Sequence, residues 1–183
     1  MDIKISVRGD FMNKKKSKRI VVKIISATLI IVLFVSSFTA FSKYTQFEYC
    51  KKHDKMLQYL DDSEAKTFKH IMTFSEMKEA DLIVADIRKA LNYSGSRADC
   101  DIPEQLTSFC RFTDDYDYIS VQSSVNLITY KKVADTGYLW IRYSYKNLGE
   151  DDIVVTGARE ILCLIIVKET ADGYEITDIL QGP

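Results

Sequence analysis

Few side chains that could do acid–base or nucleophilic chemistry stand in a recognisable pattern in this chain. The candidates for an acid–base pair are His70, Asp81 and Asp86. Such a pair needs a neighbouring charge or burial that moves a pKa towards the working pH. Asp81 and Asp86 are five residues apart and do not share one helix face cleanly, and His70 has no partner at a familiar spacing. We therefore predict that all three are surface residues, that no residue is catalytic, and that the chain is not an enzyme.

The sequence also lacks the motifs that bind phosphate or metal. It contains no nucleophile elbow, no P-loop and no zinc-protease helix. The acidic run Asp114, Asp115 and Asp117 offers the oxygen ligands that calcium prefers, but it lacks the Gly and the distal Glu of an EF-hand loop. We predict neither a metal nor a cofactor.

The cysteines are the remaining reactive side chains, and there are four of them. None stands in a C-x-x-C pair, which argues against a zinc site and thioredoxin-like chemistry. Cys100 and Cys110 close a short, loop-like segment and are the best candidates for a disulfide, the alternative being four reduced cysteines. Cys163 stands in an apolar strand pattern and is expected to act as a small core residue.

One apolar stretch near the N-terminus has the length and composition of a transmembrane helix. Ile24 to Phe41 reads IISATLIIVLFVSSFTAF, without charge, Pro or Gly. With the apolar residues just before it, this stretch approaches the roughly 20 residues of helix that a bilayer core needs. A basic cluster precedes it and is expected to stay in the cytoplasm. The cluster consists of Lys14, Lys15, Lys16, Lys18, Arg19 and Lys23.

We therefore divide the chain into a basic cytoplasmic segment 1–19, a transmembrane signal-anchor 20–43, a helical stalk 44–63 and an extracytoplasmic domain 64–183. The true start of translation is placed at Met12, where MNKKKSKR begins. The alternative to an anchor is a signal peptide cleaved after a small-x-small site, which would release the domain as a secreted protein. Ala40-Phe41-Ser42 and Val35-Ser36-Ser37 are candidate sites.

The charge of the outer segment limits its partners. Residues 44–183 carry 24 acidic against 16 basic side chains. An acidic domain repels phosphate backbones, so we expect no binding to nucleic acid. The chain's contact with the membrane is expected through its N-terminal helix.

The pattern of the outer domain changes from helical to extended. Thr73 and Glu76 have the spacing of a capping box, and an amphipathic helix follows to about Tyr93, with Leu82, Ile83, Ile87, Ala90 and Leu91 as its apolar stripe. From Tyr118 apolar residues alternate, which predicts about four antiparallel strands. They lie near 118–127, 138–146, 153–167 and 174–180, with a bulge or bend marked by Gly157. The predicted fold class is α+β, with helices packed on a curved antiparallel sheet.

This order, together with the ending DGYEITDILQGP, resembles the nuclear transport factor 2-like or cystatin-like superfamily in a single-span bacterial membrane protein. Gly173, Tyr174, Ile176, Asp178 and Ile179 carry the likeness. The resemblance implies a cavity between helix and concave sheet. A ligand pocket there would be lined by aromatic side chains of the sheet, and the candidates are Tyr138, Trp140, Tyr143 and Tyr145. They cannot all line it, because Tyr138 and Trp140 alternate along the strand with the other two.

Three functions are compatible with these observations. The first is a non-enzymatic binding or assembly module, anchored in the membrane, that binds a protein partner or itself. The second is a sensor or carrier that holds a small apolar ligand in the cavity. The third is a hydrolase or isomerase of the same fold, which fold alone does not exclude. The absence of catalytic motifs favours the first.

Overall fold

The computed structural model describes residues 7–53, 56–60, 62–115, 117–171 and 173–182, with the backbone alone described for residues 7–19, 53, 58 and 59. The chain divides into two compact units, Met1–Tyr44 and Thr45–Pro183. The side chains of the basic cluster therefore lie outside the description, except for that of Lys23. Each unit is described by itself.

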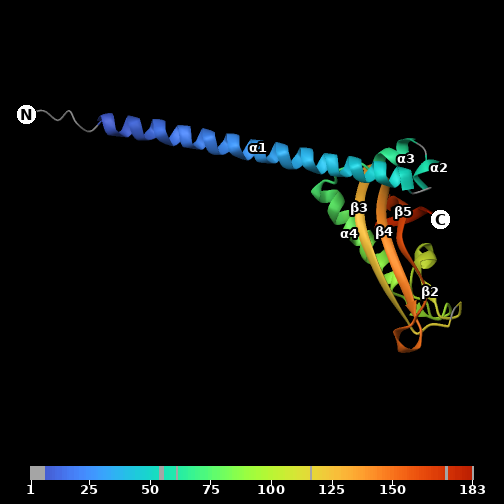
Figure 1. The fold of residues 1–183 in the computed structure, drawn as a ribbon. Helices are drawn as coiled ribbons and strands as arrows, with labels where there is room; N and C mark the ends of the chain where they lie inside the picture. The colour runs from blue at the N-terminus through green and yellow to red at the C-terminus, as the bar shows by residue number, and fades with distance from the viewer. Residues whose placement is uncertain (1–6, 54–55, 61, 116, 172, 183) are drawn as a thin grey trace, which may run out of the picture. The chain divides into compact units, whose positions relative to one another are not determined.

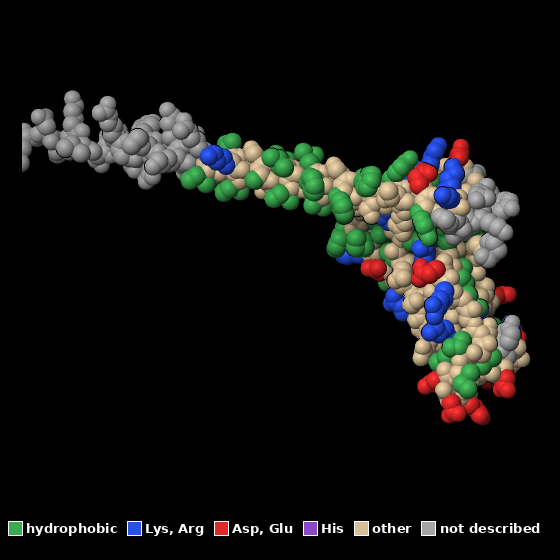
Figure 2. All heavy atoms as spheres, viewed as in Figure 1, with side chains coloured by type: hydrophobic (Ala, Val, Ile, Leu, Met, Phe, Trp, Pro, Cys, Tyr) green, Lys and Arg blue, Asp and Glu red, His purple; other side chains and the backbone are tan. Residues whose placement is uncertain are grey.

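The first unit is formed largely by helix α1 (Val7–His53), which continues into the second unit. Its segment Ile20–Lys52 is long and apolar enough to cross a membrane, and none of its most apolar window is buried. Figure 2 shows the hydrophobic side chains projecting from the visible sides of this helix. Hydroxyl groups within the segment donate to the carbonyl four residues earlier, as Ser36 does to Val32 at 2.8 Å, which satisfies them without water. The N-terminal helix thus has the properties of a membrane anchor or a signal sequence.

The second unit is built on one four-stranded antiparallel sheet, in the order β3-β4-β5-β6 (Figure 1). The strands are β3 (Ser120–Val133), β4 (Thr136–Leu148), β5 (Val154–Thr170) and β6 (Gly173–Gln181). The predicted α+β fold and its four strands are confirmed.

The irregularities of β5 lie on either side of Gly157, not at it. The register with β4 shifts around Val155 and again around Arg159–Glu160, and Glu160 has a φ of 57°. A Cβ at Gly157 would lie 2.6 Å from the carbonyl oxygen of Tyr145. The glycine is therefore needed for close approach of two backbones, while the extra residues of the bulges are its neighbours.

Helix α4 (Phe74–Leu91) packs on one face of the sheet. Thr73 caps it and Glu76 completes the predicted capping box. The predicted apolar stripe is buried except at Leu82, which is 68% exposed. That assignment is wrong because Leu82 is one residue, and hence about 100° of helix, away from the buried Ile83.

Short segments complete this layer. The 3-10 helix η1 (Glu104–Phe109) buries Leu106 and Phe109, and Pro103 stands at its cap position. Strands β1 (Ser94–Gly95) and β2 (Arg111–Phe112) form a parallel pair beside it.

A second helical layer covers the opposite face of the sheet. It consists of the end of α1 from Thr45 onwards, α2 (Met56–Tyr59) and α3 (Asp62–Thr67). Segment 44–63, expected to be a stalk, supplies buried side chains to a cluster on this face. The buried members of the cluster are Phe47, Cys50, Met56, Leu57, Phe68, Ile128, Trp140, Leu162 and Leu164. The sheet is thus covered on both faces, which explains why the run from Leu162 to Val167 is apolar at nearly every position.

Candidate functional site

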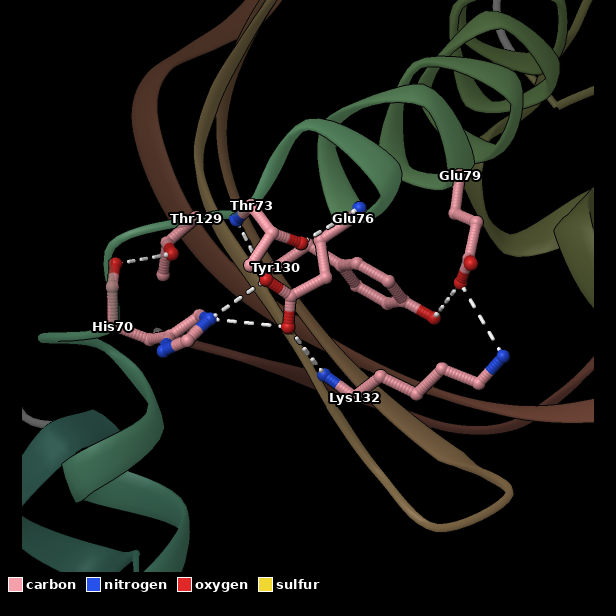
Figure 3. A network of polar contacts seen from close by, with 7 residues as sticks. All are labelled: His70, Thr73, Glu76, Glu79, Thr129, Tyr130 and Lys132. Atoms are coloured by element: carbon pink, nitrogen blue, oxygen red, sulfur yellow. Dashed lines mark hydrogen bonds and ion pairs between the residues drawn. The ribbon is translucent and has the colours of Figure 1, made fainter.

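The densest polar network among the described residues lies where α4 begins, against β3 (Figure 3). The Glu76 carboxylate accepts hydrogen bonds from the backbone N–H of Thr73 at 2.7 Å and of Lys132 at 3.3 Å. Nε2 of His70 lies 3.0 and 2.9 Å from its two oxygens. One carboxylate therefore joins the loop before α4, the helix itself and strand β3.

The electrostatics of Glu76 follow from these bonds. Burial by itself would raise its pKa, but the hydrogen bonds from Thr73, His70 and Lys132 outweigh burial and hold the pKa at about 2. Glu76 is therefore an anion at neutral pH, and its oxygens are occupied by protein donors. The Glu76 carboxylate therefore connects segments of the chain.

His70 is fixed from a second direction. Its carbonyl oxygen accepts a hydrogen bond from the hydroxyl of Thr129 at 2.7 Å, and its side chain is only 26% exposed. His70, expected at the surface without a partner at a familiar spacing, is half-buried and has Glu76 as its partner. Its separation of six residues from Glu76 spans a loop and a helix start, so no helical spacing indicates the pair. The sequence indicated the capping-box role of Glu76, but it did not indicate that Glu76 also contacts His70.

A second polar group adjoins the first on β3. Nζ of Lys132 lies 2.8 Å from Glu169 and 3.5 Å from Glu79. The hydroxyl of Tyr130 donates to Glu79 at 3.4 Å, and burial, followed by the charge of Glu79, raises the pKa of Tyr130 to about 12. These residues line a cavity of about 210 Å³, below the roughly 300–1,000 Å³ typical of small-molecule sites.

The four predicted pocket aromatics are divided between the two faces of the sheet. Trp140 is fully buried in the cluster with Phe68, at a centroid distance of 5.0 Å, and its Nε1–H donates to Thr67 Oγ1 at 2.8 Å. Tyr138 packs against the same cluster. Tyr143 and Tyr145 pack on the α4 face. The structure therefore does not bring the four together.

The two tyrosines of the α4 face have different surroundings. Tyr143 is 2% exposed, meets Phe109 edge-on at 5.6 Å and donates to Gln181 at 2.9 Å. Tyr145 has the Arg111 guanidinium 3.8 Å from its ring centroid. It also borders an open hollow of about 320 Å³ that includes Arg159.

The other acidic candidates are spread over the surface. Asp81 is exposed, and Asp86 accepts a short hydrogen bond from the hydroxyl of Tyr174. Asp114 accepts from the backbone N–H of Arg97 at 2.7 Å, and Asp115 lies 2.9 Å from its guanidinium. The acidic loop thus pairs with an arginine, and in the described part of the chain no three ligand-type side chains gather as a metal would require.

Among the described residues, none of the four cysteines forms a disulfide. Cys100 and Cys110 lie beside each other on the α4 face, where burial and then the neighbouring Cys100 raise the pKa of Cys110 to about 12. Cys163 is fully buried, as expected for a core residue. Sγ of Cys50 accepts a hydrogen bond from Arg142 at 3.1 Å.

Within the described part of the chain, the first half of β5 has an unpaired outer edge, which no sequence motif indicates. β5 has 17 residues and β6 has nine, and β6 pairs with β5 only from Cys163 to Thr170. Among the described residues, no strand pairs with the outer side of residues 154–161. In the sequence, this edge was indicated by the different lengths of the predicted strands 153–167 and 174–180.

Apolar side chains are exposed at this open edge. Ile153, Val154 and Val155 are 65%, 53% and 49% exposed, and Ile119 is 65% exposed. Ile119 lies at the same end of the sheet but on the other side of β4, because its N–H donates to Leu148, the β4 residue that pairs with Val154. In Figure 2 hydrophobic and acidic side chains lie together at the end of the sheet where β4 turns into β5. The adjoining acidic turn is Glu150–Asp152.

Comparison of the chain with protein-family models, curated proteins and solved structures finds no match.

Proposed function

We propose that this chain is a membrane-anchored extracytoplasmic domain that acts as a non-enzymatic binding module. Its proposed binding surface is the open edge of β5, residues 154–161, together with Ile119 and Ile153. The single observation that carries the proposal is the exposure of three consecutive β-branched residues beside a strand edge that β6 leaves unpaired.

An unpaired strand edge is a template for another strand. Its free N–H and C=O groups can bond either to water or to an added strand, and natural proteins usually block such edges with charge, Pro or a covering element. The edge of β3 is blocked in this way near its end, because the N–H of Lys132 donates to Glu76. From Ile153 to Ala158 the β5 segment carries neither charge nor Pro.

The chemistry of the edge favours an extended segment of a partner protein. Val154 and Val155 would contact apolar side chains of the added strand, and the acidic turn Glu150–Asp152 would attract Lys or Arg at its end. A second copy fits less well. Antiparallel pairing of two copies about Gly157 would set Val155 opposite Arg159 and Val154 opposite Glu160.

The membrane location rests on the N-terminal helix. We propose that it is an uncleaved signal-anchor with the basic residues before it in the cytoplasm, and that residues 44–183 lie outside. The exposure of its apolar side chains in the structure supports a lipid environment for it.

The filled space between α4 and the sheet supports a binding module over a small-ligand carrier. Ile87, Leu91, Leu139 and Ile141 occupy it and are fully buried. The arrangement of α4 on four antiparallel strands supports, as a proposal, membership of the nuclear transport factor 2-like or cystatin-like superfamily.

Site-specific photo-crosslinking in intact cells tests the proposal. A crosslinking residue at Val155 should give an adduct with another protein, whereas the same residue at Val133, 48% exposed at the end of β3, should not. The mapped partner peptide should be extended, alternately apolar, and end in Lys or Arg. An adduct with a second copy, or none at Val155, would overturn the proposed partner.

A pair of substitutions provides the matched control. Val154→Lys should abolish the adduct from position 155, because a charged side chain on the edge opposes strand addition. Val133→Lys should leave it unchanged. Equal loss in both variants would mean that the β5 edge is not the binding surface.

A further inference from the structure

We propose that Cys100 and Cys110 are an oxidisable pair that forms a disulfide in the compartment receiving residues 44–183. This bond would close segment 100–110 over η1. The inference rests on the proposed membrane topology for its oxidising surroundings, since structural disulfides persist outside the cytoplasm. The pairing itself rests on the fold.

The fold holds the two cysteines next to each other. Cys110 is 4% exposed and belongs to the cluster under α4, and the partly buried Cys100 packs against the same cluster. The thiol of Cys110 donates to the carbonyl oxygen of Leu106 at 3.9 Å, and Cys100 is near enough for its charge to raise the pKa of Cys110. A disulfide requires the two sulfur atoms to approach to about 2 Å.

The segment between the cysteines is anchored, so their proximity is a property of the folded domain. Ile102, Leu106 and Phe109 are buried at 6%, 3% and 0% exposure. Cys110 N–H bonds to Thr107, and Cys100 N–H bonds to Arg97 at 3.5 Å. Both ends of the segment are therefore fixed by local bonds and by core packing.

The other two cysteines are internal controls. Cys50 lies in the cluster on the opposite face of the sheet, and Cys163 is fully buried on the α4 face. The sheet separates Cys50 from the other three. We expect both Cys50 and Cys163 to stay reduced in the folded domain.

The reaction requires a disulfide as oxidant, which in such compartments is an oxidised dithiol protein. The more exposed Cys100 loses its proton, and its sulfur attacks one sulfur of the oxidant's disulfide, forming a mixed disulfide and releasing one thiolate. Cys110 then loses its proton and attacks the Cys100 sulfur, which releases the second thiolate. Two electrons and two protons pass to the oxidant, which leaves as a dithiol.

Mass spectrometry of the full-length protein tests the pairing. The detergent-solubilised chain is equilibrated with mixtures of reduced and oxidised glutathione, quenched with acid and alkylated. We expect one disulfide, joining the peptides of Cys100 and Cys110, with Cys50 and Cys163 alkylated only after unfolding. Free thiols at both positions in fully oxidised glutathione would overturn the inference without affecting the proposed topology.

The oxidation state of Cys100 and Cys110 in cells is compared with the membrane topology. The topology is measured separately, by the accessibility of the C-terminal domain to protease. If the domain is outside, Cys100 and Cys110 should be joined in freshly quenched cells, and free thiols there would overturn the inference. If the domain is inside, the proposed function fails, and the glutathione titration still decides the pairing.

Thermal unfolding provides a readout besides chemical labelling. Reductant should lower the Tm of the oxidised protein by about 5–10 °C, since the bond closes a short loop in the unfolded chain. Cys100→Ser, at a partly exposed position, should fold and show no effect of reductant. Cys50→Ser should retain the full effect, and loss of it there would contradict the assignment.

Discussion

The carboxylate of Glu76 joins the loop before α4, the helix and β3 through hydrogen bonds, and its replacement measures what the network in Figure 3 contributes. Glu76→Gln places an amide NH₂ against the N–H groups that now donate to the carboxylate. We expect the free energy of unfolding to fall by about 1–3 kcal/mol, the usual effect of leaving buried donors unsatisfied. Denaturant titration followed by the fluorescence of Trp140, the single tryptophan, measures it.

Glu79 is the matched control for this substitution. It lies one turn further along α4 and is 38% exposed. Its carboxylate is 3.4 Å from the Tyr130 hydroxyl and 3.5 Å from Nζ of Lys132. Glu79→Gln should therefore cost clearly less than Glu76→Gln, because exposed pairs contribute little. Equal losses in the two variants would show that the carboxylate of Glu76 has no special role.

Acid should remove the contribution of Glu76 in a defined range of pH. Its folded pKa is lowered from 4.5 to about 2, so the stabilisation is complete above pH of about 4.5 and is lost as the pH falls towards about 2. The difference in unfolding free energy between the wild type and Glu76→Gln should be constant from about pH 7 to 5 and shrink below that. A difference that grows on acidification would contradict the assignment.

At the scale of elements, the close approach of β4 and β5 depends on Gly157. Gly157→Ala places a Cβ 2.6 Å from the Tyr145 carbonyl oxygen, which is backbone and cannot rotate away. We expect a loss of about 1–3 kcal/mol in unfolding free energy, the range for overpacking. Gly149→Ala is the control, since its Cβ would lie 3.0 Å from the movable side chain of Val155 and at an ordinary contact distance of 3.8 Å from the Ile153 carbonyl oxygen. Denaturant titration of both variants compares them, and a larger loss at Gly149 would contradict this account.

The elements that could be predicted from sequence are those set by local pattern. The capping box at Thr73 and Glu76 and the alternation that defines the strands depend on neighbours a few residues apart. The face on which Trp140 is buried could not be predicted, because its covering residues, such as Phe47 and Phe68, lie more than 70 positions away. The candidate binding edge was indicated only in part: the last two predicted strands differ in length, but the residues left unpaired depend on where β6 stops pairing.

The same distinction applies to the candidate sites. The proximity of Cys100 and Cys110 was predictable because a short loop joins them. The partition of Tyr138 and Trp140 from Tyr143 and Tyr145 follows from strand alternation, but the resemblance to a cavity-containing family grouped them as pocket residues. Packing on both faces of the sheet is what separates them.

At the scale of the whole molecule, the second unit begins at Thr45, which predicts that the domain does not need the apolar helix to fold. A chain lacking residues 1–43 should be recovered in the soluble fraction. Its Trp140 should remain protected from acrylamide quenching, because the surrounding side chains, Phe68 and Leu164 among them, are retained. An aggregated product, or a quenched tryptophan, would show that the N-terminal helix contributes to the fold.

The role of the helix as an anchor is a separate question from its role in folding. Replacing residues 24–41 by leucines preserves length and hydrophobicity and removes both candidate small-x-small sites, Ala40-Phe41-Ser42 and Val35-Ser36-Ser37. If the helix is an uncleaved anchor, the wild type and the leucine variant should both resist carbonate extraction, with the same electrophoretic size. If the helix is a cleaved signal, the wild type alone should lose about 40 residues and appear outside the membrane, because only the variant lacks a site for the peptidase. N-terminal sequencing of the membrane-bound protein identifies which product is formed.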